Sequence, residues 1–419
     1  MRPAALVVEW GLRPRRGASF MESEELQVER RRRFRGARRA VVKLGTSVVS
    51  GAGGEVSAER VGPVVRALAG LRAEGRGLVL VSSGAVGLGA GRLGLSRARL
   101  GDVVVRQACA AVGQSLLMHA YEVMFGAHGV KIAQVLLTED DFTDRRRYSN
   151  LQRTMERLLK LGVVPVVNEN DTVSTAELEY VEGGRVFSDN DRLAALVASK
   201  LASDALVLLS DVDGLLVPRA GGGPAVLPYV TEVTPELRAL ASGPSLTGRG
   251  GMATKLEAAE IAMRAGCAAV IANGRRPDTL ARVFAGEEVG TAFVPTSRMA
   301  GKRRWIAYAA GVRGRVVVND GAREAILRGK ASLLASGVVR VERGFEPQDV
   351  LSIADSEGRE FARGIANCAS GEAAADLGRA DDEGVAEGDS RGRRAKVLVS
   401  RDNIVITERA AGPGAAQDE

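Results

Sequence analysis

The stretch AVVKLGTS (residues 40–47) places an apolar run, Ala40-Val41-Val42, directly before a loop that holds Lys43 and a glycine. A second glycine-rich loop, GRGGMATK (residues 248–255), ends in Lys255 and directly precedes a stretch with helical periodicity. Neither loop fits the one-piece phosphate loop GxxxxGKS/T, in which the glycines and the lysine stand side by side. Two lysines at separate glycine-rich turns indicate a site that holds a polyphosphate between them, and they predict phosphoryl transfer.

From residue 40 to about residue 295, short apolar runs alternate with stretches of helical periodicity. Because Val, Ile and Leu occupy successive positions in these runs, we expect strands buried on both faces, as in a parallel sheet covered by helices. The predicted strands are 40–44, 77–82, 130–136, 163–167, 205–209, 268–272 and 290–294. The predicted helices are 103–125, 149–160, 190–202 and 252–265. This βαβ pattern predicts an α/β fold, a three-layer αβα sandwich with a mostly parallel sheet.

One further helix is predicted between the first two strands. Its apolar stripe has helical spacing and consists of Val61, Val64, Val65, Leu68 and Leu71. Gly75 is expected to end this helix. Pro63 predicts that it begins near Gly62 rather than at Ser57, because an interior proline costs about 3 kcal/mol.

The alternation ends near residue 295, where a polar, basic segment follows. Shorter, β-like runs then appear at 316–318, 338–341, 350–353 and 397–406. Residues 370–395 are rich in Ala, Gly and acids without periodicity, and they predict a flexible insertion. The expected organisation is a catalytic domain at 39–295, a linker at 296–311, a small β-rich domain at 312–409 and a tail at 410–419.

The net charge of +7 is concentrated at the amino end of the sequence. Residues 1–39 hold 11 arginines against five acids, so the rest of the chain is close to neutral. Such a block of charge is typical of a solvated, disordered tail, which we expect at 1–38, with contact to nucleic acid or membrane as the alternative. The stretch lacks the long apolar core of a secretory signal, and Met21 is an alternative start.

The composition argues against several kinds of site. Cys109, Cys267 and Cys368 lie far apart, which disfavours a disulfide framework or a zinc site and suits a cytoplasmic protein. With His119 and His128 as the only histidines, neither a His-ligated metal site nor a Ser-His-Asp triad is expected. No apolar run approaches the roughly 20 residues of a membrane span, so a membrane is not an expected partner.

Polar or glycine-rich loops follow several of the predicted strands. These loops read KLGTS from Lys43, SSGAVGLG from Ser82, NEND from Asn168 and SDVDG from Ser210. Ligands bind at the carboxyl ends of the strands in open α/β sheets, so the loops together predict one crevice. Each loop alone has a simpler interpretation: tight turns at the glycines, an Asx cap in 168–171, or an N-cap in the segment SDND at 188–191.

Longer motifs extend these loops. They are VVKLGTSVV (41–49), VSSGAVGLG (81–89), VPVVNENDTV (164–173), DNDRLAALVA (189–198), LLSDVDGL (208–215), GRGGMATKLEAA (248–259), KRRWI (302–306) and GAREAILRGKASLL (321–334). With them the chain resembles the bacterial glutamate 5-kinases, a branch of the amino-acid kinase family that carries a C-terminal PUA domain. The resemblance covers 40–364, with a short return at 397–406. NENDTV together with DND separates this branch from acetylglutamate, aspartate, carbamate and nucleotide kinases.

The resemblance implies ATP-dependent phosphorylation of the γ-carboxylate of L-glutamate, the first step of proline biosynthesis, with Mg²⁺. It implies that Lys43, Lys255 and Asp191 are catalytic, with Asp191 orienting the lysines. Glutamate is assigned to Ser83, Asp171 and Asn190, with Asn168 as a further candidate. The residues assigned to ATP are Lys43, Ser210, Asp211, Arg249, Gly250, Gly251, Met252, Ala253, Thr254 and Lys255. No protein side chain is assigned to the metal.

Elementary chemistry agrees with these assignments. Transfer to a carboxylate brings two anions together, so catalysis rests on charge neutralisation and alignment, with Mg²⁺ bridging the phosphates. No general base is required, because the attacking carboxylate is already ionised near neutral pH. Gly250 and Gly251 leave backbone N–H groups free to approach phosphate at the positive end of the next helix. Asp171 offers the negative charge that an α-ammonium group needs.

Two alternatives stay open: a sister kinase that acts on another carboxylate, a phosphate or a carbamate, and an RNA-binding protein, because PUA domains resemble RNA-binding modules. Residues 312–364 hold nine basic and eight acidic residues, and their aromatic residues are Phe345 and Phe361. RNA binders show a concentrated basic face and stacking aromatics, so nucleic acid is not the expected partner. The resemblance further implies a homo-oligomer, dimer or tetramer, and coupling to a glutamyl phosphate reductase.

Overall fold

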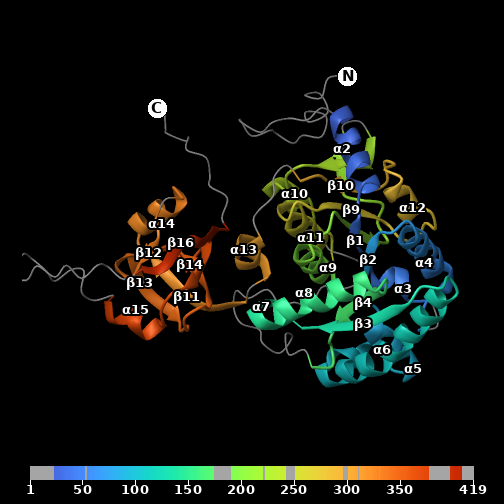
Figure 1. The fold of residues 1–419 in the computed structure, drawn as a ribbon, viewed down its shortest axis with the longest axis horizontal. Coiled ribbons are helices and arrows are strands. Elements are labelled where there is room, and N and C mark those ends of the chain that lie inside the picture. The colour runs from blue at the N-terminus through green and yellow to red at the C-terminus, as the bar shows by residue number, and fades with distance from the viewer. Residues whose placement is uncertain are drawn as a thin grey trace, which may run out of the picture. The chain divides into compact units, whose positions relative to one another are not determined.

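The computed structural model describes residues 23–51, 54–138, 140–173, 190–219, 222–241, 251–295, 301–309, 311–329, 331–376 and 397–407. The chain divides into two compact units (Figure 1). The first unit is Met1–Asp141 with Arg145–Met299, and the second is Phe142–Asp144 with Ala300–Glu419.

Within the described residues, eight strands of the first unit form one sheet in the order β3-β4-β2-β1-β5-β9-β10-β8. The central strand β1 (Arg39–Leu44) pairs in parallel with β2 (Gly77–Ser82) and β5 (Ala205–Ser210). The other strands are β3 (Ile132–Leu137), β4 (Val164–Glu169), β8 (Tyr229–Val230), β9 (Ala268–Asn273) and β10 (Thr291–Phe293). Among the described strands of this sheet, β10 runs antiparallel to β9 and the other pairs are parallel. The mostly parallel sheet predicted from the apolar runs is therefore confirmed. A separate hairpin of β6 (Leu216–Arg219) and β7 (Gly222–Val226) was not anticipated.

Helices cover both faces of this sheet and form the three predicted layers (Figure 1). One face packs against α4 (Ala58–Ala73), α6 (Val103–Gly126) and α12 (Thr279–Phe284). The opposite face is covered by α9 (Asn190–Lys200) and α11 (Met252–Arg264). Further helical segments are α3 (Thr46–Val49), α5 (Ala85–Arg92), a 3-10 turn at Arg97–Gly101, α7 (Asp140–Thr143), α8 (Arg145–Lys160) and α10 (Pro235–Ala241).

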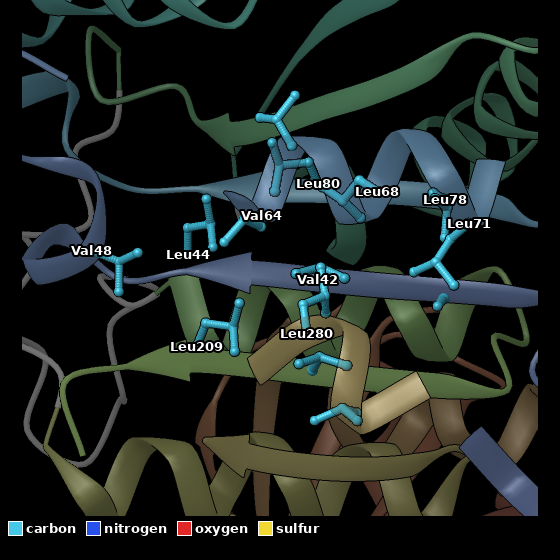
Figure 2. Close-up of a cluster of buried hydrophobic side chains, with 14 of the residues drawn as sticks. Val42, Leu44, Val48, Val64, Leu68, Leu71, Leu78, Leu80, Leu209 and Leu280 are labelled. Carbon is cyan, nitrogen blue, oxygen red and sulfur yellow. The ribbon is translucent and has the colours of Figure 1, made fainter. Parts of the chain in front are cut away.

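The hydrophobic core on the α4 side determines where Lys43 points. Val42 and Leu44 of β1 lie in a buried cluster with Leu68 of α4 and Leu80 of β2 (Figure 2). Successive side chains of a strand point to opposite faces of the sheet. Lys43 stands between Val42 and Leu44, so it is directed to the face that α9 and α11 cover.

The expectation of a disordered tail at 1–38 is wrong for residues 23–35, which form α2 (Ser23–Arg35) against α12 and β9. Phe34 is fully buried, and its ring meets that of Phe284 edge-on at 6.5 Å. The buried Arg30 donates a hydrogen bond to the carbonyl of Val289. Acids in the first turn and arginines in the last turn also suit the helix dipole. A count of charges does not predict this helix, because the burial of one of its faces is what stabilises it. Residues 1–22 lie outside the described part.

The helix α4 begins at Ala58, not near Gly62, and therefore contains Pro63. Val61 explains the earlier start: it is fully buried, and its N–H donates to the carbonyl of Ser57 over 2.9 Å. The proline removes one backbone hydrogen bond near the amino end of the helix. Burial of a valine contributes roughly 1.5–3 kcal/mol, which offsets that loss.

The second unit contains, among the described residues, one sheet in the order β12-β16-β15-β14-β11-β13. Its strands are β11 (Val312–Val318), β12 (Leu333–Leu334), β13 (Val338–Arg343), β14 (Val350–Ala354), β15 (Glu360–Ala366) and β16 (Val397–Ile406). The predicted β-like runs correspond to β11, β13, β14 and β16, whereas β12 and β15 were not anticipated. Val316, Leu351 and Phe361 lie in the buried core of this unit.

Short helical segments complete the second unit. They are α13 (Gly301–Arg304), a π-helical turn at Trp305–Ala309, α14 (Asp320–Leu327), a 3-10 turn at Ala335–Gly337 and α15 (Ser370–Asp376). The flexible insertion predicted at 370–395 is wrong at its start, because Ala373 of α15 is fully buried in the core. Residues 377–395 lie outside the described part.

Candidate active site

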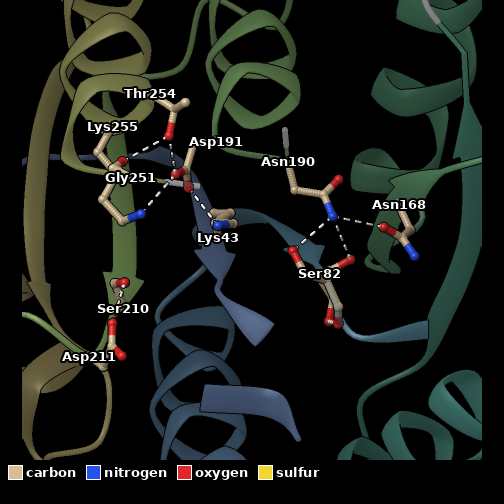
Figure 3. A network of polar contacts seen from close by, with 11 residues as sticks. Lys43, Ser82, Asn168, Asn190, Asp191, Ser210, Asp211, Gly251, Thr254 and Lys255 are labelled. Atoms are coloured by element: carbon tan, nitrogen blue, oxygen red, sulfur yellow. Dashed lines mark hydrogen bonds and ion pairs between the residues drawn. The ribbon is translucent and has the colours of Figure 1, made fainter. Parts of the chain in front are cut away.

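Two lysines and one aspartate meet at the carboxyl end of β1 (Figure 3). Nζ of Lys43 lies 2.6 Å from Oδ1 of Asp191, and Nζ of Lys255 lies 3.1 Å from Oδ2 of the same carboxylate. Asp191 is fully buried, and each lysine is 5% exposed. Oγ1 of Thr254 also donates to Oδ2 of Asp191, over 3.4 Å. The two lysines of the separate glycine-rich loops thus share one carboxylate.

Three elements bring these side chains together. Lys43 lies near the end of β1, Asp191 lies in the first turn of α9, and Lys255 lies in the first turn of α11. Because α9 and α11 cover the same face of the sheet, their amino ends can meet the carboxyl end of β1. The helix dipole stabilises an aspartate in a first turn, which favours the ionised form of Asp191.

Charge pairing keeps Asp191 ionised despite its burial. Burial by itself raises the pKa of this carboxyl group. The charges and hydrogen bonds of Lys43 and Lys255 outweigh that effect and hold the pKa of Asp191 below its ordinary value. Two ammonium groups around one carboxylate leave an excess of positive charge, which suits the binding of an anion.

A chain of amide groups lies beside this cluster. Nδ2 of Asn190 donates to Oγ of Ser83 over 2.8 Å and to Oδ1 of Asn168 over 3.0 Å. Nδ2 of Asn168 donates in turn to Oε1 of Gln114 over 2.9 Å. Ser83, Asn168 and Asn190 were predicted as substrate residues, and these hydrogen bonds make them neighbours at the ends of β2 and β4 and the start of α9. Figure 3 shows Asn190 beside Asn168.

Gln114 was not singled out from the sequence. It is 9% exposed and lies on the buried face of α6, together with Ala110, Leu117 and Tyr121. These residues stand four positions before it and three and seven positions after it. A buried amide needs hydrogen-bond partners, so a lone glutamine in an apolar helical stripe is the signal that could have indicated it.

Close packing of α5 on α6 holds the amide chain near the loop that follows β2. Gly84, with a φ of 108°, turns the chain from β2 into α5, in a conformation that favours glycine. A Cβ at Gly113 of α6 would lie 1.7 Å from the carbonyl oxygen of Ala85, so only glycine permits this approach. The hydroxyl groups of Tyr121 and Ser82 lie 2.7 Å apart and connect α6 to the end of β2.

A third group of predicted residues lies at the carboxyl end of β5. Oγ of the buried Ser210 donates to Oδ1 of Asp211 over 3.1 Å, and Arg275 lies 3.7 Å from the other oxygen of that carboxylate. The N–H of Gly45 donates to the carbonyl of Leu209 over 2.9 Å. This bond ties the loop that follows Lys43 to the end of β5, so the two groups are adjacent.

The remaining predicted residues lie at the start of α11, in the turn after β4 or outside the described part. Gly251 is the N-cap of α11, and Met252, Ala253 and Thr254 belong to its first turn, at the positive end of a 13-residue helix. The residues Arg249 and Gly250 lie outside the described part. Asp171 lies in the turn after β4 and is half-buried. Its assignment to the α-ammonium group of glutamate stays a prediction.

Two other kinds of site are absent from the described residues. Among them, no group of three or more His, Cys, Asp or Glu side chains is arranged to hold a metal ion. In the same part of the chain, no helix combines the length and apolarity that crossing a bilayer requires.

The site thus has two chemically different halves. The ammonium groups of Lys43 and Lys255 and the amino end of α11 can hold a polyphosphate. The hydroxyl and amide groups of Ser83, Asn168 and Asn190 can hydrogen-bond a small polar acceptor. The two halves lie at the same edge of the sheet, which is the arrangement that phosphoryl transfer requires.

The matching family models and similar relatives agree with this chemistry. The amino acid kinase family model matches residues 38–273, and the PUA domain model matches residues 314–382. A glutamate 5-kinase from Myxococcus xanthus is 49% identical over 337 residues, which cover 80% of this chain and 87% of that protein. One from Pelobacter propionicus is 39% identical over 381 residues, covering 90% of this chain and 100% of that protein. A solved UMP kinase from Bacillus anthracis, 14% identical, covers 62% of this chain and 97% of that one with a TM-score of 0.42.

Proposed function

The chain belongs to the amino acid kinase family, and we propose that it is a glutamate 5-kinase, which transfers the γ-phosphoryl group of ATP to the γ-carboxylate of L-glutamate. The observation that carries the proposal is the convergence of Lys43 and Lys255 on Asp191. Relatives with the name glutamate 5-kinase support glutamate as the acceptor. The product would be L-glutamyl 5-phosphate, the first intermediate on the route to proline.

In this proposal the lysines neutralise the charge of the transferred group. Negative charge lies on the phosphoryl oxygens while the attacking carboxylate and the leaving phosphate are both nearby. Lys43 and Lys255 approach from different elements, so their ammonium groups can meet that charge from two sides. Asp191 holds both groups before the substrates bind, so little reorganisation is needed during the reaction.

The acceptor needs no general base. The γ-carboxylate of glutamate is ionised at neutral pH and attacks directly. Asp191 therefore has no proton to remove, and both of its oxygens already contact lysines. Its proposed role is to position the two ammonium groups.

ATP is assigned to the edge formed by the ends of β1 and β5 and the start of α11. Backbone N–H groups from Gly251 onward suit the phosphates. Ser210 and Asp211 are proposed to line the rest of the nucleotide. Mg²⁺ would supply further neutralisation of the phosphates. We assign its ligands to phosphate oxygens and water, because the carboxylate of Asp191 is engaged by the lysines.

The experiment that tests the proposal is a panel of acceptors with ATP and MgCl₂. Hydroxylamine traps an acyl phosphate as a hydroxamate, so L-glutamate should yield γ-glutamyl hydroxamate with formation of ADP. N-acetyl-L-glutamate, L-aspartate, carbamate and UMP are the matched alternatives. We expect kcat/KM for L-glutamate to exceed each of theirs by at least about 100-fold. A higher value for another acceptor would identify a sister kinase instead.

For the unit that matches the PUA model we propose a structural or regulatory role rather than RNA binding. Several of its described arginines are paired with acids: the pairs are Arg315–Glu342, Arg323–Asp355, Arg340–Glu342, Arg359–Asp355 and Arg363–Glu360. Pairing reduces the positive charge available for phosphate contacts. Filter binding to total RNA that is tight at low salt and falls steeply with added salt would contradict this proposal.

The proposed product also suggests a partner. An acyl phosphate hydrolyses readily, so we propose functional coupling to a reductase that consumes it in the cytoplasm. We further propose that the chain assembles as a homo-dimer or homo-tetramer, which light scattering of the purified protein would test.

A further inference from the structure

We propose that Gln114 is a positioning residue that orients Asn168 and Asn190 for recognition of the α-ammonium group of the acceptor; this inference rests on the proposed function. Gln114 contacts Asn168 and lies on α6, one hydrogen bond removed from the predicted substrate residues.

The direction of the amide chain follows from its donors and acceptors. Nδ2 of Asn190 lies 3.5 Å from the carbonyl oxygen of Ser82, which can only accept a hydrogen bond. The nitrogen of Asn190 therefore faces β2, and Asn168 must offer it an oxygen. This leaves the nitrogen of Asn168 facing Gln114, which receives it with Oε1. The orientation of each amide thus depends on the next one along the chain.

Each end of the chain of amide groups has a buried polar atom that indicates a bound ligand. Oδ1 of Asn190 and Nε2 of Gln114 are buried and have no hydrogen-bond partner among the residues that the structure describes. Buried polar atoms are nearly always paired, so such atoms require an explanation. Figure 3 shows the oxygen of Asn190 directed away from Ser82. An acceptor oxygen at this place suits an ammonium group, which only donates.

Reversing the orientation of these amide groups would change which ligand the site recognises. If Asn168 turned its amide by half a turn, its nitrogen would face the nitrogen of Asn190, and two donors would meet. Asn190 could avoid that clash only by turning as well, which would lose its contact with the carbonyl of Ser82 and present Nδ2 where Oδ1 now lies. A donor at that position opposes an ammonium group, so the orientation that Gln114 and the carbonyl of Ser82 hold from the two ends favours an amino acid over a plain dicarboxylate.

The position of Gln114 is itself fixed by packing. Its neighbour Gly113 brings α6 against the carbonyl of Ala85, and about two turns further along α6 the hydroxyl group of Tyr121 reaches that of Ser82. Both contacts join α6 to the end of β2 and the loop after it, which is where Ser83 lies. A side chain on a helix held in this way can orient its partner more accurately than one on a loop.

Two variants of similar size test the proposal. Gln114→Met removes the acceptor that holds Asn168, whereas Gln114→Glu keeps an acceptor oxygen. For Gln114→Met we expect KM for L-glutamate to rise about tenfold, because a hydrogen bond to a buried amide is lost. KM for ATP should stay within about twofold, and Gln114→Glu should keep KM for L-glutamate within about threefold of the parent.

Glutarate, which lacks the α-ammonium group, distinguishes orientation from general damage to the site. Its inhibition constant against L-glutamate should change less than about twofold in Gln114→Met. Thermal unfolding verifies that each variant is folded, and Gln114→Ala replaces the methionine variant if that protein is insoluble.

Several results would overturn the proposal. These are an unchanged KM for L-glutamate in Gln114→Met, equal increases in both variants, or equal weakening of glutamate and glutarate. They are separate from failure of the proposed function, which would show as a parent enzyme that does not phosphorylate L-glutamate at all.

Discussion

Asp191 of the first unit and Asp355 of the second are both buried carboxylates with a lowered pKa, but they are held in different ways. The partners of Asp191 are lysines from two other elements, far away in the sequence. Asp355 accepts from the backbone N–H groups of Glu357 at 3.1 Å and Arg359 at 2.9 Å, within its own turn. The backbone bond from Arg359 is the largest cause of its lowered pKa, while burial opposes it.

The difference separates a site from a structural turn. The local bonds of Asp355 close the connection between β14 and β15, and they would form wherever this turn occurs. The contacts of Asp191 exist only when β1, α9 and α11 are assembled. They do not stabilise any one of these elements by itself. A lowered pKa alone therefore does not indicate function, whereas the origin of its partners does.

Asp191→Asn should have the largest effect. The substitution leaves two buried ammonium groups without their counter-charge, and breaking a buried ion pair costs roughly 3–5 kcal/mol of unfolding free energy. Urea unfolding of the first unit would measure this loss, and kinase turnover should fall with it. Asp278→Asn, at an exposed carboxylate, is the matched control. Equal unfolding midpoints for the two variants would remove the basis of the comparison.

Lys43→Ala and Lys255→Ala should follow, with their main effect on catalysis. Each should lower kcat by about 100- to 1,000-fold, equivalent to roughly 3–4 kcal/mol, as when a single donor to the transition state is removed. The hydroxamate assay measures turnover, and circular dichroism verifies the fold. Lys160→Ala removes an exposed lysine at the end of α8 and should leave kcat unchanged. Near-normal turnover in either site variant would exclude that lysine from the reaction.

Asp355→Ala should affect the second unit alone. The loss of its turn hydrogen bonds should lower the stability of that unit by about 1–3 kcal/mol. Hydrogen exchange at Glu357 and Arg359 would show the loosened turn, while turnover of L-glutamate stays at the parent level. A loss of turnover as large as that of the lysine variants would mean that the turn contributes to the site.

Acid titration should show that the ionised forms of Asp191 and Asp355 both stabilise their units, and that both contributions are lost at low pH. A carboxyl group whose folded-state pKa is lowered contributes stability above its ordinary pKa of about 4, and this is lost as the pH falls through the lower folded value. Asp191→Asn should therefore flatten the acid dependence of the first unit below about pH 4, and Asp355→Asn that of the second. Unfolding followed separately in each unit would measure both, and an unchanged slope would contradict the lowered pKa.

Arg359→Ala should have the smallest effect. The side chain of Arg359 is 63% exposed, and its ion pair with Asp355 is 3.1 Å long. Exposed pairs contribute about 0–1 kcal/mol, so stability should hardly change. An NMR titration should find the pKa of Asp355 still lowered by the backbone. A return to the ordinary value would show that the ion pair, not the turn, holds this carboxylate.

The sequence predicted those parts of the molecule whose cause lies in local pattern. Runs of Val and Leu that are buried on both faces identified the strands of the first sheet, because each run carries its own signal. The start of α4 and the helix α2 were missed, since burial of Val61 and Phe34 depends on distant partners. The strands β12 and β15 were missed as well.

The candidate site follows the same division. The glycine-rich loops are local and were found directly, whereas the role of Asp191 came from the resemblance alone. Its contacts with Lys43 and Lys255 depend on assembly of the sheet, which no local pattern contains. Gln114 was not predicted as a site residue because its partner Asn168 lies on another element, although its place in an apolar stripe was visible in the sequence.

The helix α2 ends at Arg35, and the strand that carries Lys43 starts at Arg39. Because this connection is so short, a change to α2 is transmitted to β1. A carrier protein fused directly to α2, or a protease that cuts within it, would disturb the strand that carries Lys43. The backbone N–H groups of Arg38 and Arg39 both donate to Asp204 at 2.9 Å, which makes this junction the last anchor before the strand. An expressed form of the protein should therefore keep Ser23–Arg35 intact and carry any tag ahead of this helix on a flexible spacer.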